Sequence, residues 1–309
     1  MRRNYSLLPH EKQKIYGFNR EAGQIMGWEI IKFDVCSVWN FTTGKDVIVA
    51  VLDTGCDVNH PDLKDNILDG YNIIDNNSNV MDENGHGTHV CGTIGAKNNG
   101  IGMVGIAPDV KILPIKILNK RGSGKEKDIA NGIIWASDNG ADIITMSLGS
   151  PSPSKNIENA IDYATKKGCV IFCAAGNNGT SSPILYPAKY NTTIAIGSIG
   201  KNLNRSIFSC SGDELDFLSP GEDIFSCAPN NSYVLMSGTS MATPFAVGCA
   251  ALALSFYRKN QSSIRLSQDK YMELFTKVAK PLNNKDYQER KYMGNGIIYP
   301  ITKDILQST

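Results

Sequence analysis

Four short segments each place one chemically capable side chain among small neighbours. They are "AVLDTGC" around Asp53, "NGHGTHV" around His86, "AAGNNG" around Asn177 and "SGTSMATP" around Ser240. A histidine can remove the proton of a serine hydroxyl, and an aspartate can orient that histidine, which makes the serine a nucleophile. An asparagine amide can donate a hydrogen bond to the oxyanion that forms when the serine attacks a carbonyl. Together these residue types indicate acyl-transfer chemistry.

Each of these residues also has a simpler explanation. Asp53 precedes Thr-Gly, a usual setting for a turn, and the same tripeptide occurs in aspartic proteases, which need two carboxylates sharing one proton. The chain contains Asp-Thr-Gly once. Ser240 begins an apolar helical stretch and suits an N-cap. His86 and His89 are spaced like a metal-binding pair, but no third ligand is near in the sequence and we expect His89 to be structural.

Elements that could bring the four segments together are visible in the hydrophobic pattern. Runs that are apolar on both faces suit a buried parallel sheet, and helical patterns that end in glycine lie between them. The predicted fold class is therefore α/β, with a three-layer arrangement of a mostly parallel central sheet and helices on both faces. Ligands bind beyond the carboxyl ends of such strands. The expected strands are 47–52, 111–118, 141–148, 169–175 and 193–199, and the expected helices are 127–140, 156–168 and 267–279, with a long apolar helix from Ser240.

Composition narrows the class of protein. The chain has 309 residues, of which 41% are hydrophobic and 20% charged, with a net charge of +1. These values are ordinary for a soluble globular protein and give no reason to expect a nucleic-acid partner. We find neither a signal-peptide pattern at the N-terminus nor a stretch near the roughly 18 apolar residues of a membrane span. We therefore expect a cytoplasmic protein without a membrane partner, and we expect most of its eight cysteines to be core thiols.

The four motifs, in this order, resemble the subtilisin family of serine proteases. They are Asp-Thr-Gly, His-Gly-Thr-His, Ala-Ala-Gly-Asn and Gly-Thr-Ser-Met-Ala-Thr-Pro, and the resemblance covers about residues 29–260. It implies a subtilisin-like fold and a serine endopeptidase that acts through an acyl-enzyme. By this resemblance Asp53, His86 and Ser240 form the catalytic triad, and the Asn177 side chain and the Ser240 N–H bind the oxyanion. Protein and peptide substrates are the expected partners.

The resemblance also implies where substrate lies. Two edges match the family's substrate-binding strands, and the first specificity pocket ends at about Leu185, where many relatives have glycine. We expect Leu185 to shorten this pocket, so that small or medium side chains fit better than large aromatic ones. A phosphate-loop interpretation of "GSGK" fails, because Asn119 and Glu126 stand where that motif needs Gly and Ser or Thr. The expected substrate-binding residues are Gly122, Ser123, Gly124, Ser147, Leu148, Gly149 and Leu185.

Calcium is the expected cofactor. "HPDL" (60–63) and "KNNGIGMVG" (97–105) match the family's tight calcium site, and calcium prefers carboxylate and carbonyl oxygens. Gln24 could add a ligand to this site, and a glycine-rich loop without an ion is the simpler alternative. The expected ligands are Asp62, the Asn99 side chain and the carbonyls of Lys97, Ile101 and Met103. A second, weaker cation site is expected near Ala188, Tyr190, Thr193 and Asp216.

The predicted domain organisation is an N-terminal extension at 1–28 and a subtilisin-like catalytic domain at 29–309. "LLPH" (7–10) and "GNGIIYP" (294–300) are more similar to the intracellular branch of the family, although His10 departs from that branch's element. We expect Leu7, Leu8 and Pro9 to lie across the cleft, which would make the chain a zymogen activated by cleavage before about residue 28. A disordered tail is the alternative, and a homodimer is suggested by the branch alone.

Two other functions remain open from the sequence. A pseudoprotease would bind peptides without cutting them, but such proteins usually lack a triad residue or the asparagine, and this chain has all four. An esterase of the α/β-hydrolase type would carry Gly-x-Ser-x-Gly and the order Ser, Asp, His. Here the serine lies in Gly-Thr-Ser-Met-Ala and the order is Asp, His, Ser. The sequence therefore favours the protease.

Overall fold

The computed structural model describes residues 4–17 and 23–308. Its strands are β1 (Asn4–Leu7), β2 (Glu11–Gly17), β3 (Ile48–Asp53), β4 (Tyr71–Asn72), β5 (Lys111–Lys116), β6 (Ser123–Lys125), β7 (Ile143–Met146), β8 (Leu148–Gly149), β9 (Val170–Ala174), β10 (Ile194–Ile199), β11 (Phe217–Pro220), β12 (Ile224–Ala228) and β13 (Ser232–Ser237). Its helices are α1 (Trp28–Lys32), α2 (Val35–Trp39), α3 (His86–Gly95), α4 (Glu126–Asp138), α5 (Lys155–Lys166), α6 (Thr239–Arg258), α7 (Gln268–Val278), the 3₁₀ helix η2 (Lys285–Tyr287), α8 (Arg290–Met293) and α9 (Lys303–Gln307).

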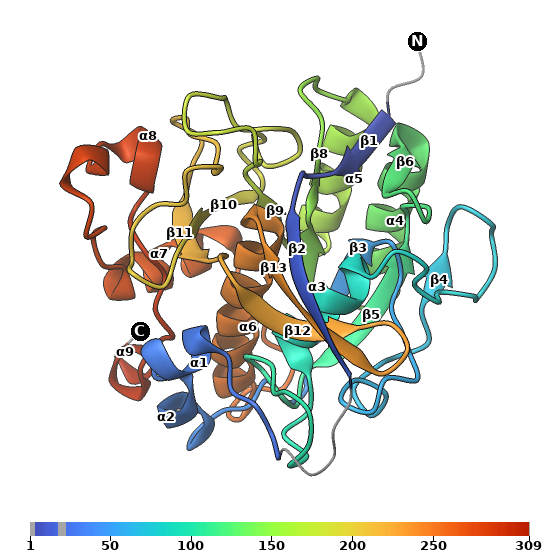
Figure 1. Cartoon of the computed structure of the whole chain (residues 1–309), viewed down its shortest axis with the longest axis horizontal. Coiled ribbons are helices and arrows are strands. Elements are labelled where there is room, and N and C mark those ends of the chain that lie inside the picture. Colours follow the sequence, from blue (N-terminus) through green and yellow to red (C-terminus); the bar gives the residue numbers. More distant parts are fainter. Residues whose placement is uncertain (1–3, 18–22, 309) are drawn as a thin grey trace.

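A seven-stranded sheet forms the centre of the described structure (Figure 1). Its strand order is β11-β10-β9-β7-β3-β5-β4, and every neighbouring pair is parallel. Strand β3 is therefore an inner strand between β7 and β5, and all residues of β7, β9 and β10 are buried. Burial on both sides explains why these strands are continuous apolar runs instead of alternating ones.

Helices cover both faces of this sheet. α3 and α6 pack against each other and against strands of one face, whereas α4 and α5 pack together against the other. Gly140 and Gly168, which follow α4 and α5, have φ values of 85° and 86°, a conformation that only glycine adopts without strain. The predicted three-layer α/β fold is confirmed.

Helix α6 carries Ser240 near its start and runs through the interior. It spans 20 residues, and an 18-residue stretch of it has a mean hydropathy of 1.4, so by length and composition it could cross a membrane, which the sequence did not lead us to expect. However, 94% of the most apolar window is buried inside the protein. Its apolar side chains face α3 and the central sheet, so the hydrophobicity of α6 is explained by its position in the core.

The structure differs most from the sequence prediction in the N-terminal segment. Its residues are polar and poorly periodic, yet β1 and β2 are strands in two separate small sheets. β1 lies antiparallel between β6 and β8, and β2 lies antiparallel on β13, which pairs with β12 on its other side. These strands depend on the edges that they join, a tertiary effect that local propensity does not show.

The cysteine prediction is also confirmed. All eight cysteines are free thiols; seven are buried and Cys36 is intermediate. They therefore act as small apolar residues of the core.

Candidate active site

Asp53, His86 and Ser240 come from three elements that meet at the carboxyl end of β3. Asp53 is the last residue of β3, His86 is the first residue of α3, and Ser240 is the second residue of α6. His86 Nδ1 lies 2.9 Å from both carboxylate oxygens of Asp53, and both residues are buried. A carboxylate in this position fixes the tautomer of the imidazole with its proton on Nδ1 and leaves Nε2 as the basic atom.

The serine hydroxyl points to another acceptor in this structure. Ser240 Oγ donates to the carbonyl of Ser147 at 3.3 Å, and His86 Nε2, which is buried, has no hydrogen-bond partner within the described residues. The structure therefore pairs Asp53 with His86 but does not form the hydrogen bond between serine and histidine.

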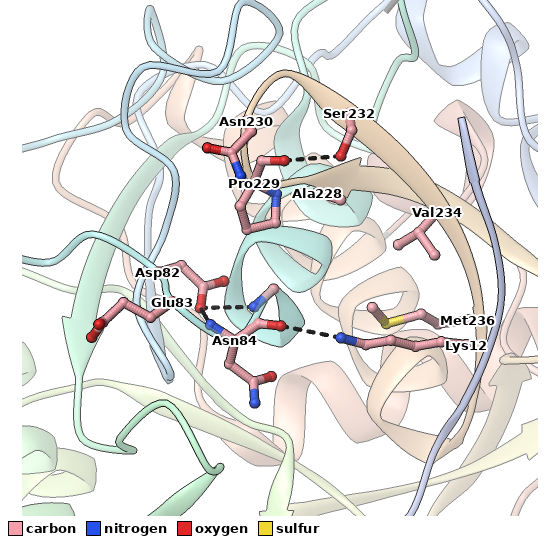
Figure 2. A pocket seen from close by; sticks show the side chains of 11 residues that line it. Lys12, Asp82, Glu83, Asn84, Ala228, Pro229, Asn230, Ser232, Val234 and Met236 are labelled. Atoms are coloured by element: carbon pink, nitrogen blue, oxygen red, sulfur yellow. Dashed lines mark hydrogen bonds between the residues drawn. The ribbon is translucent and has the colours of Figure 1, made fainter. Parts of the chain in front are cut away.

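Asp82 is a functional candidate that the sequence inspection missed. This buried carboxylate accepts hydrogen bonds from the Thr54 hydroxyl at 2.9 Å and from the amides of Asn84, Gly85 and Thr88, each at 2.9 Å. Figure 2 shows it beside Glu83 and Asn84. Burial acts to raise the pKa of Asp82, but hydrogen bonds from Gly85 and Thr88 hold it below the usual range.

These contacts connect the two halves of the candidate dyad. Thr54 directly follows Asp53, and its hydroxyl also accepts from the amide of Gly87, which directly follows His86. Asp82 thus ties the end of β3 to the start of α3. The sequence feature that could have pointed to Asp82 is an aspartate four residues before His86, in "DENGH". His89, in contrast, donates from Nε2 to the carbonyl of Ile224 and is fully buried, which gives it a structural position.

Asn177 presents its amide in a fixed orientation. Its Oδ1 accepts from the amide and the hydroxyl of Thr239, at 2.9 and 2.7 Å, so that Nδ2 must face the opposite way. Nδ2 donates to the carbonyl of Pro9 at 2.6 Å. Thr239 precedes Ser240, and so the amide donor is held next to the candidate nucleophile. A peptide carbonyl from the N-terminal segment already lies at this donor.

The rest of that segment occupies the predicted substrate edges. β1 pairs with β6 through Ser123 and Gly124 and with β8 through Leu148 and Gly149, and the amide of Leu7 donates to the carbonyl of Gly122 at 2.8 Å. The hydroxyl of Ser147 donates to the carbonyl of Ser240 at 3.1 Å. The structure thus places the predicted substrate-binding residues on either side of an extended strand.

Leu8 fills a small apolar pocket beside these edges. Its side chain is 2% exposed and clusters with Ala174 and Leu185. A Cβ atom added to Gly149 would lie 2.8 Å from Leu8 Cδ2 and 3.0 Å from Leu185 Cδ1, so Gly149 forms the opposite wall. Leu185 therefore lines the apolar pocket that Leu8 fills.

Two successive residues of the extension occupy the pocket and the Asn177 amide. Leu8 occupies the pocket, but Pro9 supplies the carbonyl, and the carbonyl of Leu8 instead accepts a hydrogen bond from His10 Nδ1 at 3.1 Å. The His10 ring lies against the ring of His86, with the ring centroids 5.0 Å apart. Burial, together with the nearby His86, lowers the pKa of His10 to about 4.

The first predicted cation site gathers several oxygens around one amide group. Gln24 Nε2 donates to the carbonyl of Lys97 at 2.7 Å, to the carbonyl of Met103 at 3.1 Å and to Asn99 Oδ1 at 3.4 Å. Asp62 Oδ1 lies 3.3 Å from Asn99 Nδ2, and Ile101 donates its amide to Asn99 Oδ1. Three of these oxygens lie within 3.4 Å of one amide nitrogen, and the Asp62 carboxylate lies next to Asn99; carbonyl, amide and carboxylate oxygens of this kind fit calcium.

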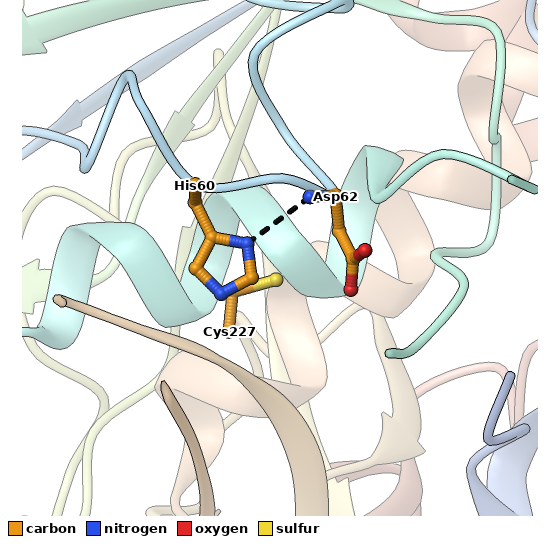
Figure 3. Close-up of side chains that lie close together, drawn as sticks. All are labelled: His60, Asp62 and Cys227. Atoms are coloured by element: carbon orange, nitrogen blue, oxygen red, sulfur yellow. Dashed lines mark hydrogen bonds between the residues drawn. The ribbon is translucent and has the colours of Figure 1, made fainter. Parts of the chain in front are cut away.

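Asp62 is also held from its other side. Its Oδ2 accepts from the amide of Met103 and the hydroxyl of Tyr233, at 2.8 and 2.9 Å. His60, Asp62 and Cys227 come together here, with their ligand atoms within 4.8 Å of one another (Figure 3). Both nitrogens of His60 already have backbone partners, the amide of Asp62 and the carbonyl of Ser232. The histidine therefore serves to fix the loop that carries Asp62.

At the second predicted cation site, donors of the protein itself satisfy the oxygens. The hydroxyl of Thr193 is within 3.3 Å of the carbonyl of Ala188 and 2.8 Å of that of Tyr190. Asp216 accepts from the amide of Ala195 at 2.8 Å and lies 4.0 Å from Arg290, and burial raises the pKa of Asp216 to about 6. A cation here would have to displace these contacts.

Comparison with known proteins identifies the family. The model of the subtilase family matches residues 44–296. The chain is 42% identical over 271 residues to an intracellular serine protease of Paenibacillus polymyxa, which covers 85% of this chain and 82% of that protein. It is 40% identical over 272 residues to the major intracellular serine protease of Bacillus subtilis strain 168, covering 85% and 84%. It is 44% identical over 234 residues to subtilisin DY of Bacillus licheniformis, covering 75% and 84%.

The parallel sheet, the buried Asp53–His86 pair and these matches define a subtilisin-type serine protease. The chain belongs to the subtilase family. The family resemblance drawn from the four motifs is therefore confirmed.

Proposed function

We propose that this protein hydrolyses peptide bonds of proteins with Asp53, His86 and Ser240 as its catalytic triad. The observation that carries the proposal is the buried Asp53–His86 pair, in which Nε2 has no hydrogen-bond partner among the described residues and can act as a base. His86 takes the proton of Ser240 as the hydroxyl attacks the carbonyl and returns it to the leaving amine. Asp53 orients the imidazole and stabilises its charged form, and water then hydrolyses the acyl-enzyme.

Asn177 Nδ2 and the backbone N–H of Ser240 stabilise the oxyanion in this mechanism. Two features support the role of Asn177: Thr239 fixes its amide, and a peptide carbonyl already accepts a hydrogen bond from it. Loss of one donor of this kind raises the barrier by about 2.7–4 kcal/mol.

The direct test is hydrolysis of casein and of a chromogenic peptide by a chain that begins at residue 18, which lacks β1 and β2, and by the same chain carrying Ser240→Ala. The parent should cleave both, and Ser240→Ala should retain no measurable cleavage while still binding peptides. Equal activity of the two proteins would disprove the mechanism. A parent that binds the peptide but cleaves none would favour the alternative, a peptide-binding pseudoprotease.

Residues 1–28 act in this proposal as an inhibitory extension of a catalytic domain at 29–309. Its support is the register at the site. In a productive complex, the residue that fills the specificity pocket is also the residue whose carbonyl enters the oxyanion hole, but here Leu8 fills the pocket and Pro9 supplies the carbonyl. The extension therefore lies along the substrate path with its bonds displaced by one residue. Proline also fixes φ and supplies no N–H, which keeps this stretch rigid.

Two truncations separate inhibition from cation binding. A chain beginning at residue 18 loses β1 and β2 but keeps Gln24, whereas a chain beginning at residue 26 also loses Gln24. Both should be more active than the full chain, and a synthetic peptide of residues 4–17 should inhibit both. Equal activity of the full chain and the chain beginning at residue 18 would end the zymogen proposal.

Calcium stabilises the protein at the site formed by Asp62, Asn99 and the carbonyls of Lys97, Ile101 and Met103. The convergence of the Lys97 and Met103 carbonyls and of Asn99 Oδ1 around Gln24 Nε2 supports it. Binding to the folded state alone stabilises it by RT ln(1 + [L]/Kd), so a chelator should lower the melting temperature of the parent but not that of Asp62→Asn. The second site at Ala188, Tyr190, Thr193 and Asp216 stays a weaker prediction; Asp216→Asn should leave the chelator effect unchanged.

Specificity follows from Leu185 at the pocket. The pocket holds the leucine of the extension, so we expect faster cleavage after Leu or Ala than after Phe in matched substrates. A strong preference for Phe would contradict this. Leu185→Gly should shift the preference towards Phe.

The names of the two intracellular relatives support a cytoplasmic location and a broad-specificity intracellular role. Cell fractionation tests the location. The family branch suggests a homodimer, for which light scattering of the purified protein is the test.

A further inference from the structure

The N-terminal segment leaves the active site along the free edge of a second sheet. Strand β2 pairs antiparallel with β13 from Glu11 opposite Ser237 to Gly17 opposite Ser232, with one register shift. β12 occupies the other side of β13, so β2 alone covers this edge among the described strands. Without β2, β13 would present a row of unpaired backbone groups, which is a template for another extended chain.

A substrate would reach the same edge. It must enter between β6 and β8, as β1 does, and must present a carbonyl to Asn177, as Pro9 does. The residues after its cleaved bond would then follow the path of His10 and Glu11. That path arrives at Ser237, the last residue of β13, which pairs with Glu11 at the start of β2. Ser237 lies three residues before Ser240.

A cavity lies under the beginning of this path. Its volume is about 440 Å³, and its lining includes Lys12 of the extension, Val234 and Met236 of β13, and Glu83 and Asn84 from the loop before His86 (Figure 2). Lys12 Nζ donates to the carbonyl of Asn84 at 3.1 Å, and Figure 2 shows its chain extending over Met236. Lys12 is the third residue after the carbonyl at Asn177, so this cavity would receive the third residue after the cleaved bond.

We propose that, once the extension has left, β13 binds the segment of substrate that follows the cleaved bond by strand addition from Met236 to Ser232. This inference rests on the proposed protease function and adds a substrate class to it. The preferred substrate is an extended, unfolded polypeptide with about seven residues after the cleaved bond, and with a long basic or apolar side chain at the third of them. Main-chain hydrogen bonds supply affinity in such an arrangement, and alternate side-chain pockets supply selectivity.

The test keeps all 309 residues of the chain. Leu8→Asp weakens the hold of β1 at the pocket, and adding Ile15→Pro removes a backbone donor from β2 and unseats it from β13. Quenched fluorescent peptides share one sequence up to the cleaved bond and carry one, three, five or seven residues after it. In the double variant, kcat/KM should rise about tenfold from one to seven residues. In Leu8→Asp alone the rise should be smaller, because β2 still competes for β13.

Backbone methylation sharpens the test. Two seven-residue peptides carry N-methyl groups on alternate amides, so that one set faces β13 and the other faces away. The peptide methylated on the amides that face β13 should lose the rise in kcat/KM, and the other peptide should keep it. With lysine at the third position, kcat/KM should exceed that with glutamate several-fold.

Three results would overturn the inference: no rise beyond the second residue in the double variant, an equal rise in both variants, or an equal effect of the two methylated peptides. Each leaves the protease function intact, because the shortest peptide is still cleaved. If no peptide is cleaved by either variant, the proposed function itself fails.

Discussion

The residues proposed to activate Ser240 and the N-terminal extension beside them are held in different ways. Asp53, Asp82 and His86 are buried and joined by hydrogen bonds of about 3 Å between the end of β3 and the start of α3. The extension is held by strand pairing at the edges of two small sheets and by two buried side chains, Tyr5 and Leu8. The first set joins inner elements of the fold, whereas we expect the second to leave without disturbing that set. Substitutions in the first should lower activity whether or not the extension is present, and substitutions in the second should raise it.

The largest effect is expected for Asp53→Asn. The amide would hold His86 in the wrong tautomer, and replacing this aspartate in a serine protease triad lowers kcat by about 10⁴-fold. Single-turnover cleavage of a chromogenic peptide by the truncated chain measures this. The far-ultraviolet circular dichroism should match that of the parent. A loss below tenfold would show that the buried pair is not catalytic.

Asp82→Asn should have the next largest effect, because the amide places a donor against the amides of Gly85 and Thr88. We expect kcat to fall about 10²-fold with KM almost unchanged, since small displacements of a catalytic group have effects of this size. Asp69→Asn is the control, because this side chain is exposed and precedes β4 at the edge of the central sheet, so the substitution should be neutral. If KM rises while kcat is unchanged, Asp82 does not position the dyad.

Leu8→Asp should act in the opposite direction. A carboxylate does not replace a leucine in an apolar pocket without a large desolvation cost, so the extension should dock less firmly and the full chain should become about tenfold more active. Ser6→Asp is the control, since this neighbouring side chain is exposed and should change little. A chain that begins at residue 18 lacks Leu8 and the strands β1 and β2, so its activity sets the upper limit. An unchanged rate would argue that β1 does not inhibit.

The smallest effect concerns stability at the beginning of the catalytic segment. Glu29 in α1 is buried, its Oε2 has no hydrogen-bond partner in the described part of the chain, and burial raises the pKa of Glu29 to about 7. Between about pH 4.5 and 7 the folded state therefore keeps a proton that the unfolded state has lost, so stability falls as the pH rises through this window. Glu29→Gln should raise the melting temperature by a few degrees at pH 8 and hardly at all at pH 4. Equal gains at both pH values would contradict the assignment.

The sequence predicted the central sheet well because its strands carry their own signal. The runs at 47–52 and 169–175 are apolar on both faces and appear as β3 and β9. The four motifs also marked the four candidate residues of the site, because each stands among small residues in the sequence. The glycine after His86 lies so close to the backbone of Gly55 that a side chain there would collide with it. These features are local, and a local pattern is enough to find them.

Three features were not predictable in this way. β1 and β2 are strands because β6, β8 and β13 offer free edges, which are distant in the sequence. The role of Asp82 requires the closeness of Thr54 to Gly87, and nothing in "MDENGH" shows this. The direction of the Ser240 hydroxyl depends on the carbonyl of Ser147, again a contact between distant segments.

The anchoring of the extension on both sides of Ser240 has a consequence for how the enzyme is switched on. While the segment belongs to the same chain, it meets the cleft at an effective concentration set by the tether, on the order of millimolar for short connections. A cut between residues 17 and 23 turns this into an encounter between separate molecules. At a total protein concentration of about 1 μM, the freed segment would be roughly a thousandfold more dilute than its tethered form. Before the cut, the extension occupies the cleft at any protein concentration. After one proteolytic cut, dilution would be enough to free the cleft.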